Sequence, residues 1–431
     1  MTIQILRSWR IVYGILLLIL VYFIHQDQFW LIAGLFGLIF GIYIILGLQL
    51  KDNVPSDTQI NLILKIAIVF AFPLASDDIY RFYWDGCTLL DGVSPFHYKP
   101  TELIQFHPSP WQLHYSQLNS KEHYSVYPPI LQVLFAVCSF LSFHSIYIFS
   151  ILWKGILLLA DFGTIQLFKK SSFAQNKNIE YWYSWNPLLI YEVLGNGHPE
   201  GLMIYFIVSS IYYLKTNKET QSSIMLGLAA AIKLFPIGLL LFFIKNFDLK
   251  SSLRYSLLCI GIFALCMISI YPFQMNFLDS IQLYFGNFEF NGSFFLLWKA
   301  LDYYRFGFDN VDHIAPYLSI LFLIYSLVLF FKQKNQNQVS LLNTLFYAWL
   351  GYLILSTTVH PWYVLPVMVL GLIAEQYWIL IWSGTVILSY SWYDEDISTD
   401  LKYAFIILEY IAWIIFMFWG LSKKSKPDPN N

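Results

Sequence analysis

The stretch from residue 60 to residue 86, INLILKIAIVFAFPLASDDIYRFYWDG, decides the class of the fold. Residues 60–75 are almost wholly apolar, whereas the ten residues that follow carry three carboxylates and one arginine. Apolar sequence favours the hydrocarbon core of a bilayer, and charged side chains are costly there. The stretch therefore predicts a membrane helix that ends at a polar loop.

The composition of the whole chain agrees with a membrane protein. The 431 residues are 58% hydrophobic and 12% charged, against about 25% charged in an average soluble domain. Aromatic side chains make up 19% of the chain, far from the low hydrophobicity of disordered sequence. The 25 Lys and Arg nearly balance the 27 Asp and Glu, so no net field attracts nucleic acid. These values exclude a soluble globular protein, a disordered chain and a nucleic-acid partner.

Apolar runs of membrane length recur along the chain. They predict an all-α polytopic membrane protein with about 10–14 transmembrane helices, forming a single domain over residues 1–431. The runs lie near residues 11–24, 29–50, 60–75, 130–168, 181–194, 199–214, 222–245, 253–272, 314–331, 341–358, 362–374, 376–390 and 401–421. No cleavage site follows the first run, which indicates an uncleaved span.

Basic residues beside these runs predict the orientation, because cytoplasmic loops retain Lys and Arg. Cations cluster at residues 7–10, 332–334 and 422–431. With all three clusters inside, both termini are cytoplasmic and 422–431 is a basic cytoplasmic tail. Residues 76–129 and a smaller segment, 272–313, then lie outside. In a bacterial cell this would be a protein of the plasma or inner membrane.

The outer loop 76–129 is too long for a simple connection. Because long loops usually carry function, we expect a large extracytoplasmic catalytic loop bearing juxtamembrane helices. We predict that 130–143, just after it, is an incomplete or re-entrant span. Two full spans from there would place Lys169 and Lys170 outside, against the orientation rule.

Asp77 and Asp78 open this loop. If Ser76 caps a helix, both acids lie in its first turn, where backbone N–H groups favour negative charge. Asp77, Arg81 and Asp85 are spaced four apart, on nearly one helix face. An exposed helix with ordinary ion pairs explains this pattern. The functional interpretation is a carboxylate that removes a proton from an incoming hydroxyl.

Ionisable residues also stand in later breaks between apolar runs. His198 and Glu200 lie in one break, Lys233 precedes a proline in a second, and His360 and Tyr363 lie in a third. Each break also has a structural explanation: the first as a well-made helix start, the second as a lysine that snorkels to the interface, and the third as a hairpin turn. Ionisable groups at membrane depth are more often functional. Cations that hold a phosphate, together with a carboxylate base, would suit chemistry on a lipid-linked anion.

The sequence lacks the signatures of nucleotide and metal chemistry. It contains no Walker loop, dinucleotide fingerprint, zinc-ligand spacing or nucleophile elbow. The four cysteines show no disulfide or metal spacing. A nucleotide-using mechanism therefore has no support from motifs.

Taken in order, the motifs resemble the GT-C superfamily of integral-membrane glycosyltransferases, and more narrowly its polyprenyl-phosphate-mannose-dependent mannosyltransferases. The resemblance covers most of the chain and rests on the order of the motifs and their side of the membrane. It is carried by Asp77-Asp78, Arg81, Asp85-Gly86, Gly92-Val-Ser-Pro95, Tyr127-Pro128-Pro129, Asn186-Pro187, Gly197-His-Pro-Glu200, Lys233-Leu-Phe-Pro236 and His360-Pro-Trp-Tyr363. The chain departs from many relatives in two respects: two or three spans precede the acidic loop, and the two acids are adjacent.

The resemblance implies an inverting hexosyltransferase. It would move a sugar, by resemblance mannose, from a polyprenyl-phosphate donor to a glycan or glycolipid acceptor on the outer side of the membrane. Asp77 or Asp78 would be the general base. The substrate-binding candidates are Arg81, Asp85, Tyr127, His198, Glu200, Lys233, His360 and Tyr363. No obligatory cofactor is expected, since a polyprenyl monophosphate leaves with less charge than a nucleotide diphosphate. A divalent cation at Asp77 and Asp78 is the alternative.

Two other functions stay open at this point. A multi-span transporter or flippase of a lipid-linked or anionic substrate would explain Lys233 and His198, but not a large outer loop that opens with two acids. A polysaccharide polymerase or ligase is chemically related but usually carries its large outer loop late in the chain. The sugar, the acceptor and the linkage are not determined by the residues.

Overall fold

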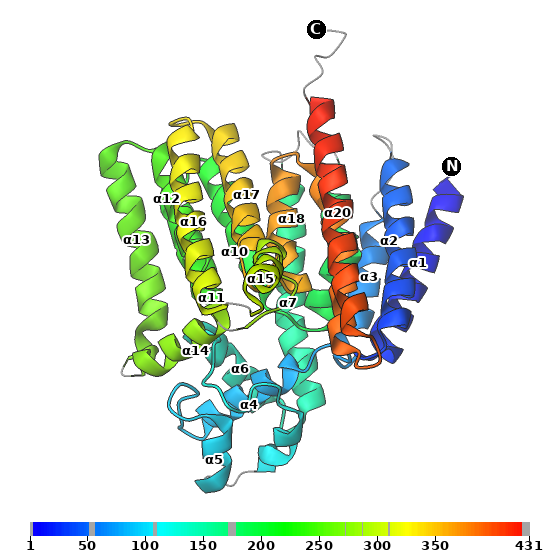
Figure 1. The fold of residues 1–431 in the computed structure, drawn as a ribbon, viewed down its shortest axis with the longest axis vertical. Helices are drawn as coiled ribbons and strands as arrows, with labels where there is room; N and C mark the ends of the chain where they lie inside the picture. Colours follow the sequence, from blue (N-terminus) through cyan, green and yellow to red (C-terminus); the bar gives the residue numbers. More distant parts are fainter. Residues whose placement is uncertain are drawn as a thin grey trace. The chain divides into compact units, whose positions relative to one another are not determined.

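A computed structural model describes residues 3–50, 57–106, 110–170, 178–271, 273–286, 288–308 and 311–424. Within these ranges the regular elements are helices (Figure 1). Isolated β-bridges also pair Phe290 and Asn291 with Thr358. The predicted all-α class is confirmed. The last seven residues of the predicted basic tail lie outside the described ranges.

Six helices in the described part of the chain are long and apolar enough to cross a membrane. They are α1 (Ile3–Phe23), α2 (Phe29–Leu48), α7 (Ile146–Phe168), α13 (Leu249–Met267), α16 (Val311–Lys332) and α20 (Thr399–Lys424). Shorter apolar helices cover Thr58–Val69, Pro129–Leu141, Pro236–Asn246 and Pro361–Ile373. The protein is therefore a multi-pass membrane protein. The predicted total of spans and the orientation of the termini stay predictions.

The chain forms two compact units rather than one run of sequential helices. The first unit comprises Met1–Thr58, Phe173–Ile190 and Phe288–Asn431, and the second comprises Gln59–Ser172 and Tyr191–Asn287. Because the chain returns to each unit after leaving it, neither unit is a continuous segment.

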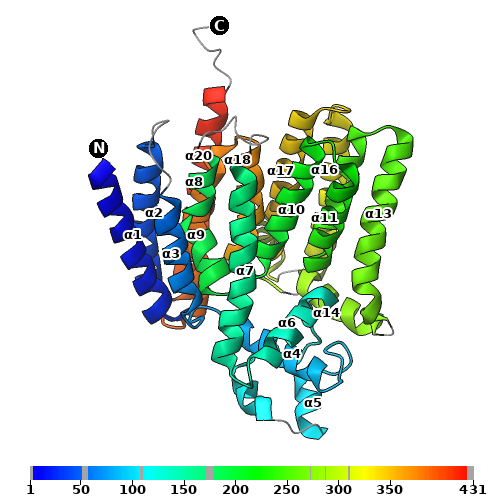
Figure 2. The same ribbon diagram turned by 180° about the vertical axis from the view of Figure 1, so that it is seen from behind.

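In the second unit, α7, α10 (Glu200–Lys215), α11 (Glu219–Ile232) and α13 lie side by side (Figures 1 and 2). Small residues bring these helices close together. A Cβ atom on Gly227 would lie 2.7 Å from the carbonyl oxygen of Cys259, so α11 and α13 require glycine there. Close approach through small residues is a common way for membrane helices to pack.

The polar loop folds at one end of these helices (Figure 2). It contains α4 (Asp78–Leu90), α5 (Pro100–Phe106) and a 3-10 helix, η1 (Pro110–Gln117). The next helix, α6 (Pro129–Leu141), has 13 residues, well short of the about 20 that cross a bilayer. This agrees with the prediction of an incomplete span. The side chains of Phe82 in α4 and Phe135 in α6 stack with ring centres 4.6 Å apart.

The apolar run 60–75 forms a shorter helix than expected, because α3 (Thr58–Val69) ends six residues early. Pro73 accounts for the difference, since proline has no N–H to donate to the carbonyl four residues earlier, that of Val69, and its ring clashes with that carbonyl. The chain therefore leaves α3 in a non-helical segment before it reaches the two acids.

In the first unit, α1 and α2 pack against each other, and α20 packs against α19 (Leu380–Thr385). The hydroxyls of Tyr13 and Tyr43 each donate a 2.6 Å hydrogen bond to a backbone carbonyl in the α8 (Ile179–Ser184) region, at Trp185 and Trp182. The helix α15 (Ser293–Phe306) runs across the long helices of this unit and is seen end-on in Figure 1.

Candidate active site

The two acids take different positions at the start of α4. Asp77 is the N-cap residue and Asp78 is the first residue of the helix. The expectation that Ser76 caps the helix is therefore wrong by one residue: its hydroxyl only accepts a long, 3.4 Å hydrogen bond from the Asp78 backbone N–H. Asp78 does lie in the first turn, where the helix dipole stabilises a carboxylate.

Asp78 joins three segments of the second unit. Its Oδ1 accepts a 3.0 Å hydrogen bond from Asn119 Nδ2, and its Oδ2 lies 3.8 Å from His198 Nδ1. The Asp78 side chain is 20% exposed, whereas that of His198 is fully buried. An acid with these neighbours is fixed in place and still reachable from outside.

His198 has a second carboxylate on its other side. Its Nε2 lies 3.3 Å from Glu192 Oε2, and its backbone N–H donates to the Glu192 carbonyl at 3.0 Å. Asn196 donates a further 3.1 Å hydrogen bond to the Glu192 carboxylate. The imidazole thus lies between Asp78 and Glu192, in the order acid, histidine, acid.

A π-helical turn, η3 (Ile190–Gly195), brings Glu192 to this position. Such turns recur at functional sites, because the extra residue redirects the side chains that follow. Gly197 then turns the chain with φ of +84°, a conformation that glycine adopts without strain. The sequence prediction missed Glu192. Its signal was a carboxylate inside the apolar run 181–194, where ionisable residues are rare.

Glu200 and Lys233 form a second pair. Pro199 is the N-cap of α10 and Glu200 is its first residue, so the helix begins one residue later than the preference of proline for the first helical position predicts. Lys233 ends α11 in an extended conformation, and its ammonium forms an ion pair with the Glu200 carboxylate. The Lys233 side chain is 35% exposed and that of Glu200 is 1% exposed. The lysine therefore reaches the surface of a cluster whose acid is buried.

Arg81 and Asp85 form a buried network that holds the loop together. Asp85 Oδ1 accepts a 2.7 Å hydrogen bond from Arg81 Nε, and its other oxygen accepts from Ser125 and Gln132. Arg81 Nη1 donates to the Ser120 carbonyl at 2.8 Å and to the carbonyl of His123. These contacts tie the start of the loop to its return segment.

Tyr127 lies at the end of the same network. Its carbonyl accepts a 3.1 Å hydrogen bond from Gln132 Nε2, and its partly buried ring packs edge-on against Phe82 at 4.9 Å. In this position Tyr127 contributes to the packing of α4 against the return segment.

The remaining candidates, His360 and Tyr363, belong to the first unit. The His360 ring stacks between Phe290 and Trp362, with ring centres 4.4 Å away on each side. Tyr363 packs edge-on against the same ring at 5.3 Å. His360 therefore has an aromatic cage within its own unit.

A buried acid supports this cage. Glu409 of α20 is fully buried and accepts hydrogen bonds from Trp382 Nε1 at 2.7 Å and from Asn291 Nδ2 at 3.1 Å. The backbone carbonyl of Phe290, next to Asn291, accepts a 2.7 Å hydrogen bond from the Val359 N–H. The sequence prediction also missed Glu409, which lies inside the apolar run 401–421.

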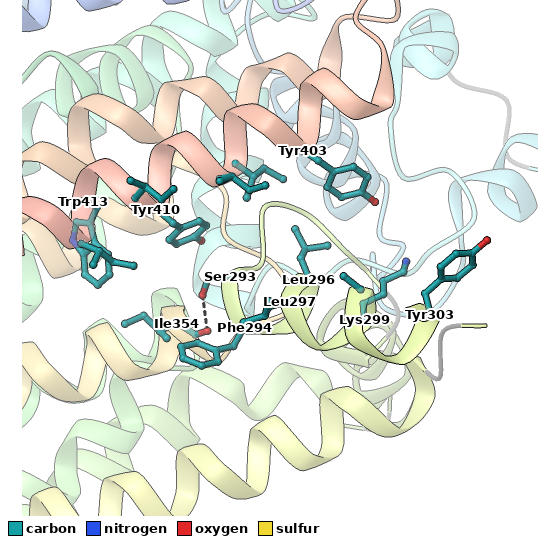
Figure 3. A pocket seen from close by; sticks show the side chains of 15 residues that line it. Ser293, Phe294, Leu296, Leu297, Lys299, Tyr303, Ile354, Tyr403, Tyr410 and Trp413 are labelled. Atoms are coloured by element: carbon teal, nitrogen blue, oxygen red, sulfur yellow. Dashed lines mark hydrogen bonds between the residues drawn. The ribbon is translucent and has the colours of Figure 1, made fainter. Parts of the chain in front are cut away.

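The first unit contains a cavity of about 960 Å³ between α15 and α20 (Figure 3). Its walls are mainly isoleucine, leucine and aromatic side chains. Lys299, Tyr303 and Tyr403 lie at one end and Trp413 at the other. Lys299 forms a 2.7 Å ion pair with Glu289. The cavity thus combines a long apolar interior with a polar end.

Within the described ranges, no group of three or more His, Cys, Asp or Glu side chains is arranged to hold a metal ion.

Comparison with known sequences identifies the family. The sequence profile of the N-terminal domain of α-(1→6)-mannopyranosyltransferases, the MptA/B family, matches residues 10–247. This range, more than half of the chain, includes the acids at the start of α4, the His198 turn and Lys233. No individual curated protein matches the chain significantly. The resemblance to polyprenyl-phosphate-mannose-dependent GT-C enzymes is thus confirmed, and the chain belongs to the MptA/B family of α-(1→6)-mannosyltransferases.

Proposed function

We propose that this protein transfers mannose from a polyprenyl-phosphate donor to a hydroxyl of a glycan or glycolipid acceptor on the outer side of the membrane, with Asp78 as general base. The observation that carries the proposal is the position of Asp78. Its carboxylate is partly exposed, held by Asn119 at 3.0 Å and within 3.8 Å of the buried His198. The orientation with both termini in the cytoplasm is part of the same proposal.

The reaction is a single displacement at the anomeric carbon. The acceptor oxygen forms a bond to C1 while the bond from C1 to the phosphate oxygen breaks, and polyprenyl phosphate leaves with the electron pair. Asp78 takes the proton of the acceptor hydroxyl. Because the family forms α linkages, inversion requires a donor in which mannose is β-linked to phosphate.

Asp78 is the better candidate for the base because its surroundings extend the proton path. His198 lies between Asp78 and Glu192, so a proton taken by Asp78 has a neighbouring imidazole that can accept it. Asp77, as the N-cap, sits beside Tyr80. Burial raises the pKa of the Tyr80 phenol, and the Asp77 carboxylate raises it further.

Lys233 is the proposed contact for the donor phosphate. Its ammonium is partly exposed, whereas the Arg81 guanidinium is buried and donates to Asp85 and to backbone carbonyls of the loop. A cation that meets the phosphate oxygens stabilises the charge that develops on the leaving group. Glu200 would then orient the lysine.

We propose that the cavity between α15 and α20, which lies within the first unit, binds an apolar lipid chain. Leu297, Ile407 and Ile411 line it and present apolar surface, while Lys299 and two tyrosines supply a polar end. An apolar chain gains about 0.8 kcal/mol for each methylene that it buries. The match in chemical character supports a lipid chain as occupant.

A metal ion is not needed in this scheme, because the Lys233 ammonium would meet the leaving phosphate. Incubation with EDTA is expected to leave transfer unchanged. Loss of transfer on chelation, with recovery on adding Mg²⁺ or Mn²⁺, would instead assign the paired acids Asp77 and Asp78 to a divalent cation.

The proposal is tested with membranes from cells that express the protein. They are supplied with polyprenyl-phosphate [³H]mannose and an acceptor extract from the native host. We expect label in a product, and an α-mannosidase specific for 1→6 linkages should release labelled mannose from it. No transfer from this donor, combined with transport of the donor across sealed vesicles, would favour the transporter alternative.

A further inference from the structure

Lys154, a residue that the proposed chemistry does not use, is buried in the middle of α7. Its side chain is fully buried, and its ammonium donates to three backbone carbonyls. They belong to Ile68 at 3.2 Å, to Ala71 and to Gly195 at 3.4 Å. A buried ammonium is costly unless its three N–H donors find acceptors, and these carbonyls supply them.

The three carbonyls come from the ends of two helices. Ile68 lies in the last turn of α3, Ala71 follows that helix, and Gly195 is the last residue of η3. The final carbonyls of a helix lack intrahelical partners and carry the negative end of its dipole. One lysine therefore satisfies and joins two helix ends that are far apart in the sequence.

Each helix end leads directly to one member of the acid and histidine pair. The segment after Ala71 runs to Asp78, and the segment after Gly195 runs to His198 within three residues. Trp153, next to Lys154, donates a 2.7 Å hydrogen bond from Nε1 to the Gly197 carbonyl. Adjacent side chains of α7 thus hold the His198 turn on both sides of Asn196.

We propose that Lys154 is a positioning residue for the transfer reaction: it sets the separation of Asp78 and His198 by clamping the two helix ends from which they emerge. The inference rests on the proposed function, because it concerns the geometry of the proposed base. The Lys154 ammonium donates to three backbone carbonyls, so it acts on the pair through the backbone.

A neighbouring pair offers a matched control. Lys65 of α3 and Asp161 of α7 form a buried 2.7 Å ion pair between the same two helices. Asp161 lies seven residues after Lys154, on the same face of α7. The double substitution Lys65→Met with Asp161→Leu removes a buried lysine without leaving an unpaired charge, and it spares the two segments that reach Asp78 and His198.

The experiment compares kcat and donor KM for the wild type, Lys154→Met, Lys154→Arg and the control pair, in protein that elutes as a single species in detergent. Lys154→Met is expected to lower kcat about 100-fold, as for a displacement near 1 Å, with donor KM changed less than about threefold. Lys154→Arg keeps the charge and the donors, so its kcat should be at least about tenfold higher than that of Lys154→Met. The control pair should keep wild-type kcat.

A double-mutant cycle distinguishes positioning from a general loss of structure. If Lys154 acts through the Asp78 and His198 pair, the kcat of Lys154→Met combined with His198→Ala should be little lower than that of His198→Ala alone. If the effects of the two substitutions on the activation free energy were fully additive, the inference would be overturned. Lys154→Gln, which keeps one donor group, replaces Lys154→Met if that variant does not fold.

Two further outcomes separate this inference from the proposed function. Wild-type kcat in folded Lys154→Met or Lys154→Gln overturns the positioning role while the enzyme assignment stands. Absence of transfer in the wild type overturns the proposed function itself, and the positioning role falls with it.

Discussion

The Nδ1 atom of His198 lies 3.8 Å from the Oδ2 atom of Asp78, at ion-pair distance but beyond the range of a normal hydrogen bond. The imidazole is fully buried and the carboxylate is partly exposed. In the proposed mechanism an acceptor hydroxyl approaches the Asp78 carboxylate from its exposed side, and the buried imidazole lies on the other side. Catalytic hydrogen bonds are often long in the absence of substrate and tighten in the reacting complex.

The order acid, histidine, acid predicts unequal effects of two substitutions. His198→Gln should lower kcat about 100-fold, because it removes the group next to the proposed base. Glu192→Gln should lower kcat about tenfold, since Glu192 acts only by orienting His198. Steady-state transfer with saturating donor measures both. Glu219→Gln, in an exposed ion pair with Arg254, is the control and should match the wild type. A larger loss of kcat in Glu192→Gln than in His198→Gln would contradict the roles assigned to the two residues.

The buried Arg81 and Asp85 pair predicts a stability effect. Asp85→Asn leaves the Arg81 guanidinium without its carboxylate and should destabilise the folded loop by about 3–5 kcal/mol, as for other broken buried pairs. The measurement is the rate of limited proteolysis within residues 76–129 in detergent. Arg81→Met combined with Asp85→Leu should be cut more slowly than Asp85→Asn alone. Equal cleavage of Asp85→Asn and wild type would show that the network does not hold the loop.

His114 predicts a pH dependence of the same loop. Burial of its ring near Tyr80 and Tyr83 lowers the pKa of His114 below its ordinary value. In the opened loop its pKa returns to about 6.5, so below that pH the opened form binds more protons and the folded form loses stability. Proteolysis should accelerate as pH falls from 7 towards 5 and change little above 7. His114→Phe keeps a ring and should weaken the acceleration; an unchanged pH profile would rule His114 out as its source.

The apolar cavity predicts a dependence on the length of the donor chain. Leu297→Trp would fill space beside α20 and should raise the KM of a long-chain donor about tenfold, equivalent to the loss of roughly two buried methylenes. The KM of a short-chain analogue, which has few methylenes to bury, should not change. Leu321→Trp, on the exposed apolar face of α16, is the matched control. Equal effects on long and short donors would contradict a role of the cavity in binding the chain.

Sequence patterns predicted the helical membrane class and the polar breaks, because both depend on local composition. Apolar runs identify α1, α2 and α20, and the breaks at His198 and Lys233 do begin or end helices. The early end of α3 was also encoded, in Pro73. These features need no knowledge of which distant segments pack together.

Three buried ionisable residues, Lys154, Glu192 and Glu409, were not predicted, although each was visible as an ionisable residue in an apolar run. Lys154 binds backbone carbonyls from two helix ends, and Glu192 reaches His198 only because η3 is a π-helical turn. Such partners carry no pattern of spacing that a sequence can show. The cost of an unpaired charge in a membrane was the available signal; it indicates that a partner exists without identifying it.

The assignment of the base is the central claim, and it is tested by Asp78→Asn and Asp77→Asn in the transfer assay with polyprenyl-phosphate [³H]mannose. Both variants keep the shape of the side chain, and single-species elution in detergent confirms that they fold. We predict that Asp78→Asn lowers kcat at least about 1,000-fold, within the range for loss of a general base, and that Asp77→Asn retains measurable turnover. Near-normal transfer by folded Asp78→Asn, with loss of transfer in Asp77→Asn, would contradict the account and make Asp77 the base.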